Sequence, residues 1–355
     1  MSTLRVTAER LTVLEHPNAD ALELAQVGLY RAVVAKDAYR SGEFALYIPE
    51  QAVLPQELIA ELGLTGRLAG AAANRVKAVR LRGELSQGIV CRPAALAGPD
   101  LARAAAGGED FAERLGIVKW VPPVPVSMSG EVESAPDLLP WTDIENLKRH
   151  PDIFAPGDPV TVDEKLHGTA CCLTFHAATG EVHVTSKGLG AQRFALKEAD
   201  GNLYWRAVRG YGLPALAADL AGRLGADRIG IYGEVYGRGV QDLGYGTEAR
   251  GGLPGYAAFD VCADIGGQLR WLDPATLPMG ALPLVPRLFE GPFDLDTVLE
   301  LARGTETVSG RGLYLREGVV VRSAESRYSP VLGGRAIAKV VSDAYLTRKG
   351  GTEYE

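Results

Sequence analysis

The chain has 355 residues, and 46% of them are apolar, so it can bury a full core and is long enough for two domains. It carries 37 lysines and arginines against 44 aspartates and glutamates; the net charge of −7 excludes a protein that is basic over its whole surface, but not one with a local basic groove. The four cysteines form no C-x-x-C pair and no apolar run reaches the length of a membrane span, so we expect a soluble, monomeric protein of the cytoplasm without a zinc knuckle, a disulfide framework or membrane contact.

Short apolar-alternating runs separated by turn residues fill the first quarter of the chain, a pattern typical of β-strands. A helix is predicted from Pro55 to Leu62, because proline begins it and glycine follows it. Strands are predicted near residues 11–14, 32–35, 44–48, 76–81 and 87–90. Together these elements predict a small closed barrel within residues 1–120.

One run in this region, His16-Pro17-Asn18-Ala19-Asp20, resembles the opening of OB-type tRNA-binding modules. The resemblance implies an OB-like domain that binds nucleic acid. The alternative is a structural β-domain that braces its neighbour, since the same run is ordinary turn chemistry. Strand alternation places Arg80 and Arg82 on one face and Arg75 and Lys77 on the other. A basic face would suit phosphates, but a solvated strand edge has the same pattern.

The middle of the chain predicts a change of domain. Residues 94–115 are rich in alanine and predict two short helices interrupted at Gly107-Gly108. The proline-rich segment that follows predicts an interdomain linker over residues 121–140, and the second domain then occupies residues 141–355. Thr142 followed by Glu145 indicates a capping box at the start of a helix.

In the second domain, charged or aromatic residues recur inside strand-like apolar segments. A lysine between two strands, with a glycine three positions later, indicates an amine at a strand end and a backbone kept clear for a ligand. Each segment alone would also suit an ordinary surface residue, so their order is the informative feature. In chain order they are Lys165-x-x-Gly168, Ser186-Lys187, Tyr232-Gly233-Glu234, Phe259-Asp260, Glu317-Gly318-Val319 and Lys339, with a helical pattern over residues 203–224.

This ordered set resembles the covalent nucleotidyltransferase superfamily of polynucleotide ligases and RNA capping enzymes. In its motif I, His167 stands where DNA ligases usually have aspartate, which resembles the RNA ligase 2-like branch of ATP-dependent RNA ligases. Too few residues follow Lys339 for the OB domain that DNA ligases and capping enzymes carry there. With its N-terminal barrel, the chain therefore resembles the Deinococcus-type RNA ligases. The matching segments are residues 165–168 (motif I), 232–234 (III), 259–260 (IIIa), 317–321 (IV) and those around Lys339 (V).

The resemblance implies an α+β fold, in which an N-terminal OB-like β-barrel precedes a nucleotidyltransferase domain of ATP-grasp-like antiparallel sheets with flanking helices. It also implies an ATP-dependent RNA ligase that seals 3′-OH and 5′-phosphate ends, with nicked duplex RNA as the expected substrate. AMP would pass from ATP to a lysine and then to the RNA 5′-phosphate, and would leave when the 3′-OH attacks. A DNA ligase, a capping-type guanylyltransferase and a non-catalytic RNA-binding protein are the alternatives.

Lys165 is the expected nucleophile, and its amine must be neutral to attack, so its pKa has to fall from about 10.4. Burial and a nearby cation lower the pKa of an amine, and a divalent metal ion, Mg²⁺ or Mn²⁺, is the expected cation. The resemblance implies that Glu317 and Glu234 hold the hydrated metal and that Lys339 contacts the same phosphate as a fixed charge. Lys165, Glu317 and Lys339 are therefore the expected catalytic residues.

The other expected nucleotide contacts are spread over the remaining motifs. Glu234 would accept a hydrogen bond from a ribose hydroxyl, and Phe259 would stack on adenine. His167 would contact phosphate oxygens or the RNA end, unless it is a turn histidine satisfied by backbone groups. The full expected set is Glu164, Lys165, Leu166, His167, Gly168, Ser186, Lys187, Glu234, Phe259 and Lys339.

Two positions depart from the family pattern. Ile337 and Val341 flank Lys339 where many relatives have a second lysine, so either Lys349 folds back toward the site or one cation suffices. Ala170 stands where phage RNA ligase 2 enzymes have asparagine, so we expect this protein to recognise RNA ends differently, through its N-terminal domain.

Overall fold

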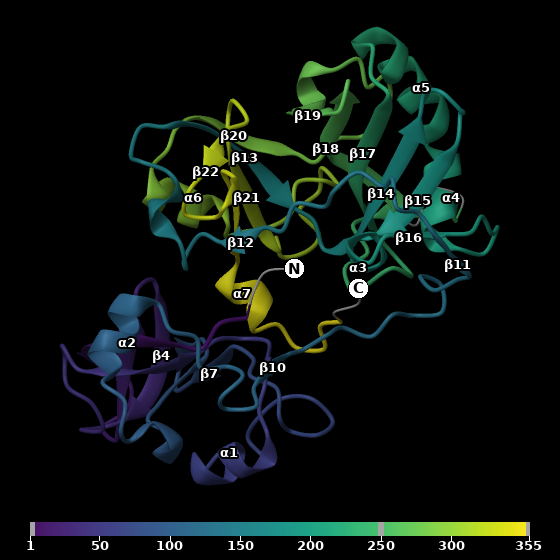
Figure 1. Ribbon diagram of the computed structural model, residues 1–355. Helices are drawn as coiled ribbons and strands as arrows, with labels where there is room; N and C mark the ends of the chain where they lie inside the picture. Colours follow the sequence, from purple (N-terminus) through teal and green to yellow (C-terminus); the bar gives the residue numbers. More distant parts are fainter. Residues whose placement is uncertain (1–3, 248–251, 353–355) are drawn as a thin grey trace. The chain divides into compact units, whose positions relative to one another are not determined.

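The computed structural model describes residues 4–247 and 252–352 of the chain (Figure 1). The chain divides into two compact units, one of residues 1–121 with 148–150 and the other of residues 122–147 with 151–355. Among the described residues, no helix is both long enough and apolar enough to cross a membrane.

The first unit is built from short antiparallel strands, as its alternating sequence predicts. β1, β5 and β9 form one sheet, β2, β3 and β4 form a second, and β6 with β10 and β7 with β8 form two pairs. Its core includes Leu46, Ile48 and Phe111, which are fully buried. The strands are β1 (Thr7–Arg10), β2 (Thr12–Glu15), β3 (Leu22–Val27), β4 (Tyr30–Ala35), β5 (Phe44–Ile48), β6 (Ala52–Val53), β7 (Val79–Leu81), β8 (Glu84–Ser86), β9 (Ile89–Cys91) and β10 (Val118–Lys119).

The helices of this unit agree only partly with the sequence pattern. α1 (Gln56–Glu61) begins after Pro55, as predicted. The alanine-rich segment forms a 3-10 turn, η1 (Ala94–Leu96), and one helix, α2 (Leu101–Gly107). That helix ends at Gly108, whose φ of 61° is left-handed.

The second helix expected after Gly108 is wrong, because that segment forms turns. The Asp110 carboxylate accepts hydrogen bonds from the backbone N–H groups of Val6, at 2.9 Å, and Ala112, at 3.0 Å. These side-chain bonds offer the backbone an alternative to a helix.

The His16-Pro17-Asn18 run, which follows β2, contacts the β7–β8 hairpin. His16 Nε2 lies 3.2 Å from the Leu81 carbonyl oxygen, and the Asn18 side-chain amide donates to the Arg82 carbonyl at 3.2 Å. Arg80 and Arg82 are exposed on this hairpin. The run therefore supports a hairpin that exposes two arginines to solvent.

The described part of the second unit contains two large sheets and one two-stranded sheet (Figure 1). The larger has seven strands in the order β11-β16-β15-β14-β17-β18-β19, and the smaller has five in the order β12-β24-β21-β13-β20. The larger consists of β11 (Val132–Ser134), β14 (Gly168–His176), β15 (Val182–Ser186), β16 (Phe194–Leu196), β17 (Arg228–Tyr236), β18 (Gly255–Ile265) and β19 (Gln268–Leu272). The smaller consists of β12 (Glu145–Asn146), β13 (Pro159–Lys165), β20 (Arg287–Pro292), β21 (Gly318–Ser323) and β24 (Ile337–Val341), and β22 (Tyr328–Ser329) pairs with β23 (Gly334–Arg335).

Helices pack on both sheets and complete their cores. The helical pattern over residues 203–224 is confirmed as two helices, whose buried faces pack with the seven-stranded sheet. Val298 of α6 is fully buried with Val160 and Val321 of the five-stranded sheet. The helices of this unit are α3 (Lys187–Ala191), α4 (Leu203–Gly210), α5 (Leu213–Leu224), α6 (Leu295–Leu301) and α7 (Asp343–Leu346), with 3-10 turns η2 (Pro151–Ile153) and η4 (Pro274–Thr276).

The helix predicted from Thr142 is wrong. The segment has no regular structure until β12, which runs parallel to β24 with Asn146 opposite Lys339. The Leu147 N–H donates to the Lys339 carbonyl at 2.8 Å, so pairing with a distant strand overrides the local capping signal.

The segment expected to be an interdomain linker is partly built into the second unit. Val132–Ser134 form β11, which pairs with β16 of the seven-stranded sheet. Met128 is only 1% exposed and belongs to the core of that sheet. Residues 122–147 therefore group with the second unit.

The chain passes from one sheet to the other between Lys165 and Gly168. Lys165 is the last residue of β13 and lies opposite Gly318 of β21. Gly168 is the first residue of β14 and lies opposite Tyr236 of β17. This crossing brings the predicted motif I next to the strands that carry the predicted motifs III and IV.

Candidate active site

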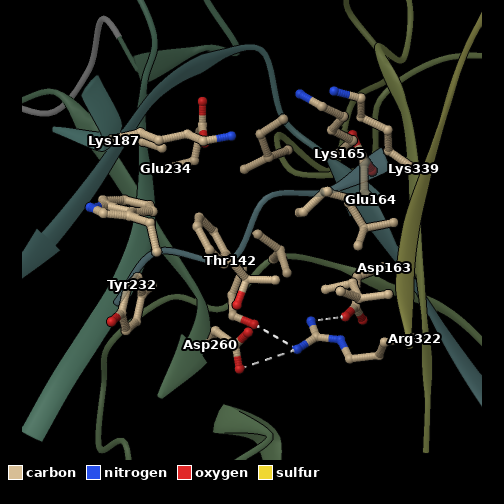
Figure 2. Close-up of a pocket in the computed structure, with 18 of the residues that line it drawn as sticks. Thr142, Asp163, Glu164, Lys165, Lys187, Tyr232, Glu234, Asp260, Arg322 and Lys339 are labelled. Atoms are coloured by element: carbon tan, nitrogen blue, oxygen red, sulfur yellow. Dashed lines mark hydrogen bonds and ion pairs between the residues drawn. The ribbon is translucent and has the colours of Figure 1, made fainter. Parts of the chain in front are cut away.

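A cavity of about 220 Å³ lies at this crossing and is lined by residues of both sheets. Lysines and Glu234 gather at one end of it, and Asp163, Arg322 and Asp260 lie at the other (Figure 2). Seven of the ten residues expected to contact a nucleotide line this cavity. They are Glu164, Lys165, Leu166, Lys187, Glu234, Phe259 and Lys339.

The Lys165 amine lies 2.7 Å from Glu317 Oε1. Burial lowers the pKa of this amine, but the carboxylates of Glu317 and Glu234 outweigh burial and hold the pKa above its ordinary value. The amine is therefore protonated, whereas a nucleophile must be neutral. A cation held by these carboxylates would offset their charge and lower the pKa of Lys165.

Glu234 and Lys339 are both shifted toward their neutral forms. Burial raises the pKa of Glu234 to about 8, although the charge of Lys165 opposes the shift. Burial, together with the charges of Lys165 and Lys187, lowers the pKa of Lys339 to about 8. Shifts of this size inside a cavity are typical of functional sites.

Gly168 and Gly318 are required by close packing of the backbone. A Cβ on Gly168 would overlap the Val235 carbonyl oxygen and the Glu234 side chain. A Cβ on Gly318 would overlap the Val340 carbonyl oxygen. The glycine of motif I thus lets β14 lie close against β17 and brings Glu234 beside Lys165.

Buried charges join the two sheets at the other end of the cavity. Arg322 of β21 pairs with Asp163 of β13 and lies 3.7 Å from Asp260 of β18. Arg335 pairs with the same Asp260 at 2.5 Å. Arg322 also donates to the Phe259 carbonyl at 2.9 Å, so this network fixes the strand that carries Phe259.

Glu164 lines the cavity, and its carboxylate is hydrogen-bonded to Thr307 in a neighbouring loop. Its Oε2 accepts hydrogen bonds from the Thr307 N–H, at 2.8 Å, and from the Thr307 hydroxyl. Burial raises the pKa of Glu164, although Thr307 and Arg316 oppose the shift.

Three expected nucleotide contacts do not line the cavity, namely His167, Gly168 and Ser186. His167 is buried, and its ring nitrogens lie 2.7 Å from Asp242 Oδ1 and 2.7 Å from the Tyr345 hydroxyl. Ser186 caps α3 by accepting the Leu189 N–H at 3.3 Å. Their expected roles in nucleotide binding remain predictions.

The structure also shows where the residues lie that bear on the two departures from the family pattern. Lys349 is exposed and does not line the cavity, whereas Lys187 does, so Lys187 supplies a further lysine beside Lys165 and Lys339. Ala170 also lines the cavity.

Sequence reasoning missed Trp141, Trp271, Asp163 and Arg322, all of which line the cavity. Asp163 could have been found, because alternation along a strand puts it on the same face as Lys165. Arg322 gave a weaker signal, as a charge near the end of an apolar strand. Trp141 gave none, because its segment was expected to begin a helix.

The donor set fits a hydrated divalent cation. Glu234 and Glu317 offer carboxylate oxygens, which Mg²⁺ and Mn²⁺ prefer. Across residues 4–247 and 252–352, no group of three or more His, Cys, Asp or Glu side chains could hold a metal ion. The ion would therefore keep water or phosphate oxygens as most of its ligands.

Comparison with known proteins identifies the family. The RNA ligase family profile matches residues 158–341, which is more than half of the chain. The chain belongs to the RNA ligase family. An OB-fold domain family matches residues 5–93. No curated protein gives a significant match.

Solved structures of the Naegleria gruberi RNA ligase resemble this chain at 22% identity. The ligase with PPi has a TM-score of 0.76 and covers 97% of this chain and 98% of that chain. A lysine-to-alanine mutant with ATP and Mn has a TM-score of 0.76, with 96% and 98% covered. A glutamate-to-alanine mutant with AMP and Mn has a TM-score of 0.75, with 97% and 98% covered. At this identity the likeness shows a shared fold.

Membership of the RNA ligase family confirms the prediction drawn from the ordered motifs, and the OB-fold match confirms the N-terminal barrel. The matched range begins before Lys165 and ends after Lys339, so every expected motif of this RNA ligase lies within it.

Proposed function

We propose that this RNA ligase uses ATP and a divalent cation to seal 3′-OH and 5′-phosphate RNA ends, carrying AMP on Lys165. The observation that carries the proposal is the Lys165 amine at the crossing of the two sheets, in a cavity also lined by Glu234, Lys187 and Lys339. The Naegleria ligase structures with ATP, AMP and Mn support this choice of nucleotide and cation, since they share the fold over nearly the whole chain.

The reaction has three transfers at phosphorus. Lys165 Nζ attacks the α-phosphorus of ATP, so that an N–P bond forms and the bond to pyrophosphate breaks. An oxygen of the RNA 5′-phosphate then attacks the same phosphorus, and the N–P bond breaks. Finally the RNA 3′-OH attacks the 5′-phosphorus of the RNA and AMP leaves.

The residues around Lys165 prepare its amine for the first transfer. Glu317 Oε1, 2.7 Å from Nζ, accepts the proton that the amine must lose. Lys339 and Lys187 offer positive charge to the phosphates. Glu234 and Glu317 would hold a divalent cation, which would supply further positive charge, lower the pKa of Lys165 and offset charge on the α-phosphate.

The rest of the cavity suits the nucleoside. Phe259 stacks on adenine, since a base needs only a flat apolar face. The bond from Arg322 to the Phe259 carbonyl fixes this strand, at 2.9 Å. Glu234 accepts a hydrogen bond from a ribose hydroxyl.

Nicked duplex RNA is the substrate we propose. The OB unit presents Arg80 and Arg82 on an exposed hairpin, and such charges suit the phosphates of an A-form duplex, which proteins read by shape. A comparison of RNA with DNA nicks, and of ATP with GTP, separates this activity from DNA ligation and from capping.

We also propose that the enzyme acts as a monomer in the cytoplasm. Its four cysteines are free and buried, which suits a reducing compartment.

Incubation with α-labelled ATP and Mg²⁺ or Mn²⁺ tests the mechanism. We expect label to remain on the denatured protein, and Lys165→Ala to lose at least about 100-fold of it, because the amine that carries AMP is then missing. Lys197→Ala is the matched control, since Lys197 is half exposed and pairs with Glu131 away from the cavity. A wild type that never carries label, or a Lys165→Ala protein labelled as strongly, contradicts the proposal.

A further inference from the structure

His167 is the residue of motif I that the mechanism above leaves without a role. It is 3% exposed, and its side chain does not line the cavity. Burial lowers the pKa of its imidazole, so the ring is neutral, with Nε2–H donating to Asp242 Oδ1 at 2.7 Å and Nδ1 accepting the Tyr345 hydroxyl at 2.7 Å. Both ring nitrogens therefore have partners, and the ring has one orientation.

The partners of His167 are themselves held by the segment that follows α7. Arg348 Nε donates to Asp242 Oδ2 at 3.1 Å, and the Thr352 N–H donates to Asp242 Oδ1 at 2.8 Å. The Arg348 guanidinium also lies 3.6 Å over the Tyr345 ring. We call Asp242, Tyr345, Arg348 and Thr352 the clasp.

The backbone on both sides of His167 is fixed by the same region. The His167 N–H donates to the Tyr245 hydroxyl at 2.9 Å, and Gln241 Nε2 donates to the Gly168 carbonyl at 2.5 Å. Tyr245 has a φ of 47°, a left-handed conformation that costs a bulky residue free energy. Its ring is buried in an apolar cluster with Leu166, so packing maintains this strained backbone where it contacts motif I.

These contacts surround the short segment that crosses between the two sheets and begins at the nucleophile, Lys165. Only Leu166 separates Lys165 from His167, and neither His167 nor the clasp lines the cavity. A displacement of about 1 Å of a reacting group lowers rates by about 100-fold, so the position of this crossing matters for attack by Lys165.

We propose that the clasp positions Lys165 for the attack on ATP by locking His167 and the crossing between the two sheets. His167, Asp242, Tyr345 and Arg348 are positioning residues, and none of them lines the cavity. This inference rests on the proposed role of Lys165. It assigns the segment after α7 to the first transfer in particular, because Lys165 is the nucleophile only in that transfer.

The test compares two reactions of the full-length protein. Tyr345→Phe removes the hydroxyl that binds His167 Nδ1, and Asp242→Asn removes the charge that binds Arg348. The matched control is Tyr314→Phe, because Tyr314 packs against the same cluster and its hydroxyl makes no hydrogen bond within the described part of the chain. The measurements are the rate of protein labelling by α-labelled ATP against ATP concentration, the sealing of a nicked RNA whose 5′ end is already adenylylated, and the thermal unfolding temperature.

We expect both clasp variants to label at least about 10-fold more slowly at saturating ATP, with a KM for ATP and a rate of sealing pre-adenylylated RNA within about 3-fold of wild type. Labelling as fast as in Tyr314→Phe overturns the proposal. An equal loss in both reactions, together with a lower unfolding temperature, also overturns it, because the clasp would then support only the fold. A wild type without label contradicts the proposed function, whereas a labelled wild type with unaffected clasp variants contradicts the clasp alone.

Discussion

At the scale of single residues, Glu234 and Lys339 line the same cavity but need opposite protonation states to act. Each has a pKa of about 8, raised by burial for Glu234 and lowered by burial and neighbouring lysines for Lys339. Glu234 must lose a proton to hold a cation, while Lys339 must keep one to hold a phosphate. As pH rises through about 8, Glu234 therefore gains the charge that holds a cation, while Lys339 loses the charge that holds a phosphate.

We predict a bell-shaped pH profile for kcat/KM of protein labelling, a quantity that reports the free enzyme. The value should rise by up to about 10-fold per pH unit below 8, as Glu234 ionises, and fall above 8, as Lys339 loses its charge. Rates at subsaturating ATP from pH 6 to 10 give the profile. Glu234→Gln should lack the rising limb, and a profile that stays flat from pH 6 to 8 in wild type contradicts the assignment.

The same carboxyl makes a prediction about stability. The pKa of Glu234 is about 8 when folded, against an ordinary value of 4.5, so at pH 7 folding requires the group to take up a proton. This cost grows as pH rises from 4.5 to 8, and glutamine, which resembles the protonated form, avoids it. Glu234→Gln should be more stable than wild type at pH 7 by about 1–3 kcal/mol and nearly equal to it near pH 4.5.

Thermal unfolding at both pH values measures this difference. The matched control is Glu325→Gln, since Glu325 is exposed in a loop and should give no pH-dependent change. A Glu234→Gln protein whose stability follows that of wild type at every pH would show that Glu234 is ionised in the folded state.

At the scale of elements, the two sheets of the second unit are joined by charge as well as by apolar packing. Asp163 of β13 receives Arg322 and Arg287, and Asp260 of β18 receives Arg335, so buried acids of both sheets depend on arginines. Removing one partner from such a network leaves a buried charge poorly compensated.

Arg322→Met should therefore lower the free energy of unfolding by about 3 kcal/mol or more. Arg223→Met is the control, because Arg223 is 60% exposed and its pair with Asp219 on α5 contributes about 0.5 kcal/mol or less. Urea unfolding measures both. Equal losses for the two variants would show that the network between the sheets adds no more than a surface pair.

The sequence predicts these elements well where pairing and pattern agree. β13, β17, β18, β21 and β24 follow from apolar runs, and α4 with α5 follow from a helical period. The segment at Thr142 shows why the rest did not follow. Its capping signal is local, but pairing of β12 with β24, almost 200 positions away along the chain, decides its conformation.

At the scale of the whole molecule, the order of the motifs is sufficient to predict the family and seven residues that line the cavity. It does not predict the residues that hold motif I in place. The predicted residues lie on strands whose sequence signal is strong. The partners of His167, by contrast, come from a loop at Asp242 and from the segment at Tyr345. Nothing in the local pattern of either segment records that it packs against motif I.

The division into two units predicts that RNA binding and nucleotide chemistry can be separated. Arg80 and Arg82 lie exposed on the β7–β8 hairpin of the OB unit, whereas Lys165 and its partners belong entirely to the other unit. A double variant, Arg80→Glu with Arg82→Glu, should therefore keep wild-type labelling by ATP. It should lose about 10-fold in the affinity for nicked duplex RNA, and the dependence of that affinity on salt should become shallower by about one to two phosphate contacts.

Labelling assays and RNA titrations at two salt concentrations measure the two activities of the same preparation. Arg103→Glu is the control, because Arg103 is exposed on α2 of the same unit and reverses one charge away from the hairpin, where the double variant reverses two. If the double variant binds nicked RNA as tightly as this control, the hairpin does not contact RNA, and the OB unit is a structural brace. Loss of labelling in the double variant would instead show that the two units act together in the first transfer.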